Sequence, residues 1–274
     1  MEPALSGNFS IRRLEALSGG KPIKENLHRH DFFYMLVITK GAGSHQIDFL
    51  PYEVLDRSIF LMRPGQVHQL DLHAGSEGYI LQFKNDFFYL QNLPAKALLR
   101  KVSHKKLCTV EEKNFVRLKT ILDYIVMEFS EMQESYEEVI KSSLYILFIE
   151  LVRHRRNREV IIISDNGYSQ EKLEKFLDLL ETSITAEKQV SYYADKLNLS
   201  IYQLGTITKS LLDKTPSEVI SGHAILEAKR RLLATSGQVN QIAYDLGYED
   251  SSYFIRFFKK HTGHSPESYR NISR

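Results

Sequence analysis

Three histidines are placed so that their imidazole rings could share one site. His28 and His30 are separated by a single residue, and His68 follows the turn signal Pro64-Gly65. Imidazole suits iron, manganese and zinc, so the three rings could hold a metal ion. They could instead be hydrogen-bonded polar groups at the mouth of a β-barrel, or groups that orient a small organic ligand.

A second pattern, from residue 251 onward, suits a helix that reads DNA. Three aromatic residues fall at i, i+3 and i+4 and would face a core: Phe254, Phe257 and Phe258. The candidates for contacts with base edges are Ser251, Ser252 and Arg256, because arginine can bond guanine twice and serine can bond base edges. Lys259 and Lys260 suit phosphates. An ordinary amphipathic helix with a solvated basic face is the simpler alternative.

The C-terminal part of the chain contains this helical unit twice, which favours DNA binding over that alternative. Residues recur in order 49 or 50 positions later, with one extra residue in the turn: Ala194, Leu197, Leu199, Leu204, Ile207, Lys209 and Pro216 correspond to Ala243, Leu246, Tyr248, Phe254, Phe257, Lys259 and Pro266. A helix, a tight turn and a second helix form the helix-turn-helix. Between the units, Thr215-Pro216-Ser217-Glu218 predicts the start of a helix that holds them at a fixed separation.

The N-terminal part favours short strands of a barrel or sandwich from about residue 11 to residue 88. Strand candidates are 32–38, 58–62 and 78–83, and 45–49 alternates as a hairpin partner of the first would. From Thr109 the period becomes helical. Thr109-Val110-Glu111-Glu112 predicts a capping box. One face of the helix that follows is apolar: Phe115, Leu118, Leu122, Ile125 and Phe129.

The next helix begins near Tyr136 and carries a stripe with 4-3-4 spacing: Ile140, Leu144, Leu147 and Leu151. This spacing is typical of a helix that packs on another helix. The partner is either the barrel of the same chain or a second copy. Our hypothesis is a dimer, because a twofold interface would place two DNA-binding halves on repeated half-sites.

Bulk composition sets limits on the class of protein. From Tyr168 to the end, 14 Lys and Arg face 13 Asp and Glu, so local clusters must attract DNA. No apolar run approaches the ~20 residues of a membrane helix, and the first residues lack the pattern of a secretion signal. The single cysteine, Cys108, excludes an intramolecular disulfide. A cytoplasmic protein without membrane contact is expected.

The C-terminal part resembles the AraC/XylS family of transcription regulators. The residues that carry the resemblance are Ile242-Ala243, Gly247, Tyr253-Phe254, Arg256, Phe258-Lys259, Gly263, Ser265-Pro266 and Tyr269-Arg270. The resemblance implies two recognition helices in successive major-groove segments. The first unit departs from the family, because Gly205-Thr206-Ile207-Thr208-Lys209 stands where members usually have a longer polar pair and then Phe-Lys. Modest base reading is therefore expected there, from Tyr202, Gln203 and Thr206, with Ser200 and Lys209 on phosphates.

The N-terminal half resembles the cupin-like effector-binding domain of the same family. The carriers are His28-x-His30-Asp31-Phe32, Gly41-x-Gly43, Ile47-Asp48, Pro64-Gly65-Gln66-Val67-His68 and Gly78-Tyr79. Metal-binding cupins usually have Glu four or five residues after the second His, where this chain has Tyr34 and Met35. We therefore expect a small organic effector near His28, His30, Tyr34 and His68, with no cofactor, metal or catalytic residue. The alternative is a cupin metalloenzyme that uses His28, His30 and His68, fused to a DNA-binding module.

The sequence thus predicts an α+β multidomain protein. We expect a cupin-like β-barrel sensor at residues 1–108 and a helical pair for dimerisation and connection at 109–158. A linker at 159–167 would lead to an all-α double helix-turn-helix domain at 168–274. The expected partners are double-stranded DNA, a small-molecule effector, a second copy in a homodimer and RNA polymerase.

Overall fold

The computed structural model describes residues 7–89, 93–159 and 167–272. The chain divides into two compact units, Met1–Ile162 and Ile163–Arg274. Most of the linker expected at 159–167 lies outside the described residues. Among the helices that are described, none is both long enough and apolar enough to cross a membrane.

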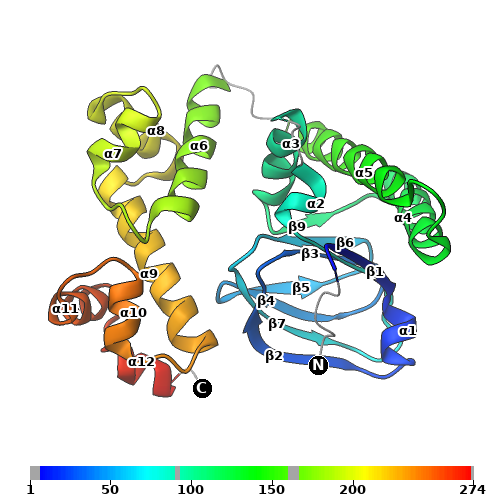
Figure 1. Ribbon diagram of the computed structural model, residues 1–274, viewed down its shortest axis with the longest axis horizontal. Coiled ribbons are helices and arrows are strands. Elements are labelled where there is room, and N and C mark those ends of the chain that lie inside the picture. Colours follow the sequence, from blue (N-terminus) through cyan, green and yellow to red (C-terminus); the bar gives the residue numbers. More distant parts are fainter. Residues whose placement is uncertain (1–6, 90–92, 160–166, 273–274) are drawn as a thin grey trace. The chain divides into compact units, whose positions relative to one another are not determined.

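The N-terminal unit contains two antiparallel sheets (Figure 1). The first sheet has the order β1-β8-β3-β6-β9 and the second has the order β2-β7-β4-β5. The strands are β1 Phe9–Arg13, β2 Ile23–Arg29, β3 Phe33–Lys40, β4 Gly43–Ile47, β5 Leu50–Val54, β6 Ser58–Met62, β7 Val67–Leu72, β8 Glu77–Phe83 and β9 Leu107–Thr109. This β-rich unit and the helical C-terminal unit confirm the expected fold class.

The expected hairpin between β3 and the strand at 45–49 is wrong. β3 pairs with β6 and β8, whereas β4 pairs with β5 and β7 in the other sheet. The chain changes sheets at Gly43, which has φ 149° and whose Cβ would lie 2.0 Å from the carbonyl oxygen of Asp71. The hairpin partner of β4 is β5, joined by Asp48 and Phe49. Both have positive φ, as a tight two-residue turn requires.

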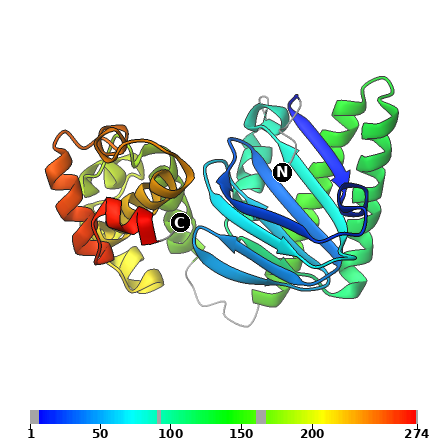
Figure 2. The ribbon, with the colours of Figure 1, turned by 90° about the horizontal axis from the view of Figure 1, so that it is seen from below.

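Strand β3 is buried on both faces. Tyr34 and Leu36 belong to the core between the two sheets, whereas Met35 and Val37 belong to the core between the first sheet and the helices. The helices of this unit are α1 Leu14–Ser18, α2 Asn85–Tyr89, α3 Leu93–Ser103, α4 Glu112–Glu131 and α5 Tyr136–Glu159. Figure 2 shows the long green helices α4 and α5 beside the sheets.

Helices α4 and α5 differ from the sequence prediction in two respects. The stripe Ile140, Leu144, Leu147 and Leu151 is fully buried within the chain, in the core that also contains the outer face of the first sheet. These side chains cannot contact a second copy, so the dimer contact expected through them is wrong and packing within the chain is observed. Thr109 does not cap a helix either, because it ends β9, opposite Ser58 of β6. α4 starts at Glu112 without a side-chain cap bond.

The C-terminal unit confirms the internal repeat. Its helices are α6 Gly167–Ser183, α7 Val190–Lys196, α8 Ile201–Leu212, α9 Pro216–Ala234, α10 Val239–Asp245, α11 Ser251–Thr262 and α12 Pro266–Ile272. α7 and α10 begin 49 positions apart, and α8 and α11, each of 12 residues, begin 50 apart. The extra residue lies in the second turn, 246–250, against 197–200 in the first. The predicted capping box is present: Thr215 Oγ1 accepts from Glu218 N, and Glu218 Oε2 accepts from Thr215 N.

The second turn also contacts the segment before the first helix-turn-helix. Gly247 has φ +74°, and a Cβ there would lie 2.0 Å from the carbonyl oxygen of Thr185. Only glycine fits this position, because it combines a left-handed backbone with a close backbone approach. The segment that leads into the first helix-turn-helix therefore contacts the second unit directly, in addition to the connection through α9.

We predict that Gly247→Ala destabilises the C-terminal unit more than Gly263→Ala does. Gly263 has nearly the same conformation, φ +80°, but its Cβ would meet no atom within 4 Å. Gly263→Ala should therefore cost only the ~1–2 kcal/mol of a left-handed alanine, whereas Gly247→Ala must also displace Thr185. Urea unfolding of the full chain, followed by circular dichroism, compares them. Equal losses would show that the Gly247 contact adds nothing.

Candidate DNA interface and histidine site

Helix α11 has the two faces that the sequence predicts. Phe254 and Phe258 are fully buried and Phe257 is partly buried, which confirms the core face. Asp250 caps the helix, since its carboxylate accepts a hydrogen bond from Ser252 N at 2.7 Å. The expected DNA-contacting side chains Ser252, Arg256, Lys259 and Lys260 are exposed, and Ser251 is half-buried.

Arg256 is the longest exposed side chain among the expected base readers. Its side chain is 71% exposed, and its Nη2 atom lies 3.9 Å from Asp250 Oδ2. An exposed ion pair at this distance contributes little to stability. The guanidinium can therefore leave Asp250 for a DNA base at small cost.

Helix α8 carries the side chains that were expected to contact DNA in the first unit. Several of them are hydrogen-bonded to the backbone of the helix itself. Ser200 Oγ accepts from Gln203 N at 3.1 Å, and Gln203 Oε1 accepts from Ser200 N at 2.8 Å, a reciprocal capping box. Thr206 Oγ1 donates to Tyr202 O at 3.1 Å. Lys209 Nζ lies 2.7 Å from the Asp213 carboxylate. All five expected side chains are exposed, and only the Tyr202 ring lacks such a bond to the helix.

Lys188 joins the two helix-turn-helix units, and the sequence analysis did not identify it. Its Nζ donates to the carbonyl oxygen of Leu246 at 2.5 Å and to that of Thr185 at 3.5 Å. It also lies 4.6 Å from the centre of the Tyr248 ring, and burial lowers the pKa of Lys188. Because Lys188 and Leu246 are 58 residues apart, no local pattern announces this contact.

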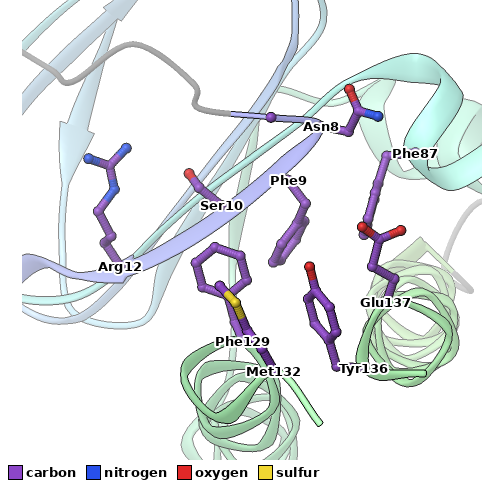
Figure 3. A pocket seen from close by; sticks show the side chains of 10 residues that line it. Asn8, Phe9, Ser10, Arg12, Phe87, Phe129, Met132, Tyr136 and Glu137 are labelled. Atoms are coloured by element: carbon purple, nitrogen blue, oxygen red, sulfur yellow. The ribbon is translucent and has the colours of Figure 1, made fainter. Parts of the chain in front are cut away.

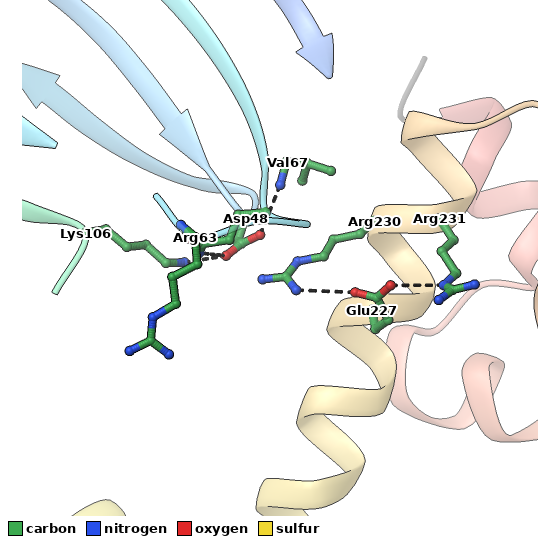
Figure 4. A network of polar contacts seen from close by, with 8 residues as sticks. Asp48, Arg63, Val67, Lys106, Glu227, Arg230 and Arg231 are labelled. Carbon is green, nitrogen blue, oxygen red and sulfur yellow. Dashed lines mark hydrogen bonds and ion pairs between the residues drawn. The ribbon is translucent and has the colours of Figure 1, made fainter. Parts of the chain in front are cut away.

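Two further polar contacts fix α9 relative to its neighbours. Arg231 bonds Glu227 at 2.9 Å within α9, as Figure 4 shows, and lies 3.5 Å from Asp245 of α10. Arg270 of α12 donates to the carbonyl oxygens of Leu232 and Gly237 near the C-terminus of α9, at 2.9 and 2.6 Å. Arg270, part of the family signature, thus has a structural role.

In the N-terminal unit the structure brings together all four residues of the expected effector pocket. The Nε2 atoms of His28 and His30 are 3.0 Å apart, and those of His30 and His68 are 3.1 Å apart. The Tyr34 ring lies 5.1 Å from the His68 ring and 5.7 Å from the His30 ring. His45 also belongs to this group, although it was not among the residues expected from the sequence; its Nε2 is 2.9 Å from His68 Nδ1. The period-2 alternation around His45 could have placed it on the inward face.

The segment that carries His68 is held by Asp48 of the β4–β5 turn (Figure 4). The buried Asp48 carboxylate accepts from Gln66 Nε2 at 2.5 Å, from Lys106 Nζ at 2.8 Å and from Val67 N at 3.4 Å. Gly65 N donates to the carbonyl oxygen of His30 at 2.7 Å. The turn at Pro64-Gly65 therefore fixes the backbones that present His30 and His68 to each other.

A separate cavity of about 400 Å³ opens on the other side of the first sheet (Figure 3). Its apolar lining is Phe9, Phe87, Phe129, Met132 and Tyr136, and its polar lining includes Asn8, Ser10, Arg12 and Glu137. A volume of this size suits a small ligand. The wall of this cavity combines β1, α2 and the turn between α4 and α5. These segments are far apart in the sequence, so no local pattern predicts the cavity.

The double helix-turn-helix and the β-rich unit with its histidine cluster together define a DNA-binding regulator with an attached ligand-binding domain. Residues 193–272 match the family described as "Helix-turn-helix domain", and residues 23–96 match the family described as "AraC-like ligand binding domain". The two matches together span more than half of the chain. The chain belongs to the AraC family of transcription regulators.

Curated relatives agree with this membership. The HTH-type transcriptional activator RhaS of Mannheimia succiniciproducens is 24% identical over 247 residues, covering 89% of this chain and 88% of the relative. RhaR of the same organism is 22% identical over 249 residues, covering 89% and 87%. Among solved structures, ToxT from Vibrio cholerae is 18% identical, with a TM-score of 0.46 and coverage of 97% and 98%.

We predict that Lys188→Met destabilises the C-terminal unit by ~1–3 kcal/mol, because the carbonyl oxygen of Leu246 loses its charged donor. Lys196→Met is the matched control, since Lys196 also lies over a tyrosine ring but is exposed. Its loss should stay within ~0.5 kcal/mol. Denaturant unfolding of both variants gives the comparison. A Lys188→Met chain as stable as the Lys196→Met chain would remove Lys188 as a link between the units.

Proposed function

We propose that this regulator reads DNA with residues 168–274 and that α11 makes most of the base-specific contacts. The observation that carries this proposal is the exposed, weakly paired Arg256 on the face opposite Phe254 and Phe258. Ser251 and Ser252 at the start of α11 would contact bases or phosphates, and Lys259 and Lys260 would contact phosphates.

Helix α8 would contribute fewer base contacts than α11. Gln203 would have to give up its cap bond to read a base, and Thr206 is short and bonded to Tyr202 O. Tyr202, which is 83% exposed, is the best-placed reader of this helix. Ser200 and Lys209 would contact phosphates near its two ends. The first unit would then position the protein, and the second would supply most of the specificity.

The curated relatives are named as transcription activators, so we propose that this chain activates transcription in the cytoplasm, with RNA polymerase as a further partner. A homodimer also remains a proposal, but through a surface other than the buried stripe of α5. Exposed apolar side chains on α4 offer one such surface: Val116, Tyr124 and Met127. We propose that this regulator acts by binding DNA and uses no catalytic residue.

The N-terminal unit would receive a small-molecule effector between its two sheets, beside His28, His30, Tyr34 and His68. Polar rings converge there within a core that is otherwise aliphatic and aromatic, as in a site that orients a ligand by a few polar groups. The ligand can change DNA affinity only by binding one arrangement of the protein more tightly than another, typically by ~1–3 kcal/mol.

Arg256→Ala should weaken binding to the preferred DNA site by ~1–3 kcal/mol and relax the preference at one base pair. Lys260→Ala should weaken binding to all sequences alike and reduce the salt slope by about one unit. Selection of bound sequences from a random DNA pool, followed by titrations at several salt concentrations, measures both effects. An Arg256→Ala protein with unchanged affinity and preference would contradict the assignment.

A thermal-shift screen of metabolites should find a compound that raises the melting temperature as its concentration increases. With the effector between the sheets, His30→Ala should abolish the shift, whereas Phe129→Ala, in the wall of the cavity in Figure 3, should leave it unchanged. The opposite result would move the effector to that cavity. Both variants should keep their DNA affinity without the compound.

A further inference from the structure

We propose that His28, His30 and His68 form a binding site for a borderline divalent cation such as Zn²⁺, which acts as a regulatory ligand and not in catalysis. The regulatory consequence rests on the effector function proposed above, whereas cation binding itself does not. Metal-binding cupins usually have Glu where this chain has Tyr34 or Met35, so the sequence alone favours a site without metal. The contacts around the three imidazoles point the other way.

Three ring nitrogens converge at this site. His30 Nε2 lies 3.0 Å from His28 Nε2 and 3.1 Å from His68 Nε2, and all three ligand atoms lie within 4.8 Å of one another. A ring nitrogen has one proton or one lone pair in its plane, so His30 Nε2 cannot form two good hydrogen bonds here. A cation that accepts a lone pair from each ring serves all three. Nitrogens ~2.0–2.1 Å from a tetrahedral zinc ion are roughly 3.3 Å apart, close to the two spacings that involve His30.

The opposite ring nitrogens of His28 and His68 have contacts that orient the two rings. His28 Nδ1 lies 2.6 Å from the carbonyl oxygen of Asn26. Because that oxygen only accepts, Nδ1 carries the proton, and the lone pair of the neutral ring is on Nε2, toward His30. His68 Nδ1 faces the Nε2 atom of the fully buried His45 at 2.9 Å. Metal-binding histidines usually hold their second nitrogen in such a hydrogen bond, which fixes the tautomer and the ring orientation.

A buried carboxylate, that of Glu25, lies on the same face as the three histidines. Residues 25 and 28 of a regular strand would point to opposite faces. The register of β2 against β7 shifts between Glu25 and His28, and this irregularity brings both side chains inward. Glu25 Oε2 lies 3.9 Å from His28 Nε2, with the Glu25 side chain only 7% exposed. Its negative charge favours a cation over a neutral ligand.

The site has an entrance and room for a further ligand. The His28 side chain is 32% exposed, whereas His68 is fully buried, so the cation would enter from the His28 side. Three imidazoles leave at least one coordination position open, as in zinc sites that bind a further molecule. An oxygen atom of an organic effector could occupy that position. The cation would also join β2 to β7 through His28 and His68, which are register partners.

The test uses the full chain after dialysis against a chelator. Calorimetry with Zn²⁺ should give one ion per chain, and Co²⁺ should give a visible absorption spectrum that Zn²⁺ abolishes by displacement. His30→Gln should lower the affinity at least tenfold and remove the absorption. His73→Gln, at an exposed histidine of the same unit, should change neither. His45→Gln should weaken binding without changing the one-to-one ratio, because His45 only orients His68.

Zinc binding that is unchanged in both His28→Gln and His30→Gln, or far below one ion per chain, would overturn the proposal. These two partly exposed histidines decide the question even where His68→Gln does not fold. Failure of the metal site is distinguishable from failure of the effector function. A metabolite that stabilises the chelator-treated protein, with no effect of Zn²⁺, would overturn the metal site and leave the effector proposal standing.

Discussion

The close approach of Gly247 to Thr185 sets the relation between the two recognition helices. Through α9 alone, the two helix-turn-helix units would be joined by one helix and could swing about it. The second turn instead contacts the segment before α7, where Lys188 bonds the carbonyl oxygen that ends α10. Phe257 packs against both cores of the unit. Such a connected pair holds α8 and α11 at one fixed spacing, which the proposed reading of successive major-groove segments needs.

The N-terminal unit holds polar imidazole rings inside an otherwise apolar core. An isolated buried imidazole loses its hydrogen bonds to water, so buried imidazoles need polar groups or a bound ion as partners. Contacts between ring nitrogens connect four histidines from the interior outward, in the order His45, His68, His30 and His28. Asp48 and the Pro64-Gly65 turn hold the backbones that carry His30 and His68. The backbone contacts of the β-sheets therefore fix the positions of these histidines.

Features of the sequence that depend on near neighbours predicted the structure well. The Phe254 and Phe258 face of α11 and the Thr215 capping box involve residues three or four positions apart, so the sequence contains all their partners. The β3–β4 hairpin, the Thr109 cap and the α5 stripe were assigned wrongly because distant elements compete for the same residues. Glu25 was missed because an irregular strand reverses its side-chain parity. Lys188 was missed because its partner is 58 residues away.

Strand β3 links the two cores of the N-terminal unit mechanically. Tyr34 belongs to the inner core beside the histidines, and the next residue, Met35, belongs to the core that α4 and α5 cover. Neighbouring side chains of one strand share a peptide unit, so a backbone shift of β3 that makes room near Tyr34 also moves Met35. Tight packing does not absorb such a shift locally. Strands β6 and β8 likewise place alternate residues in both cores, so a signal received between the sheets would reach the helices through the first sheet, without any hinge.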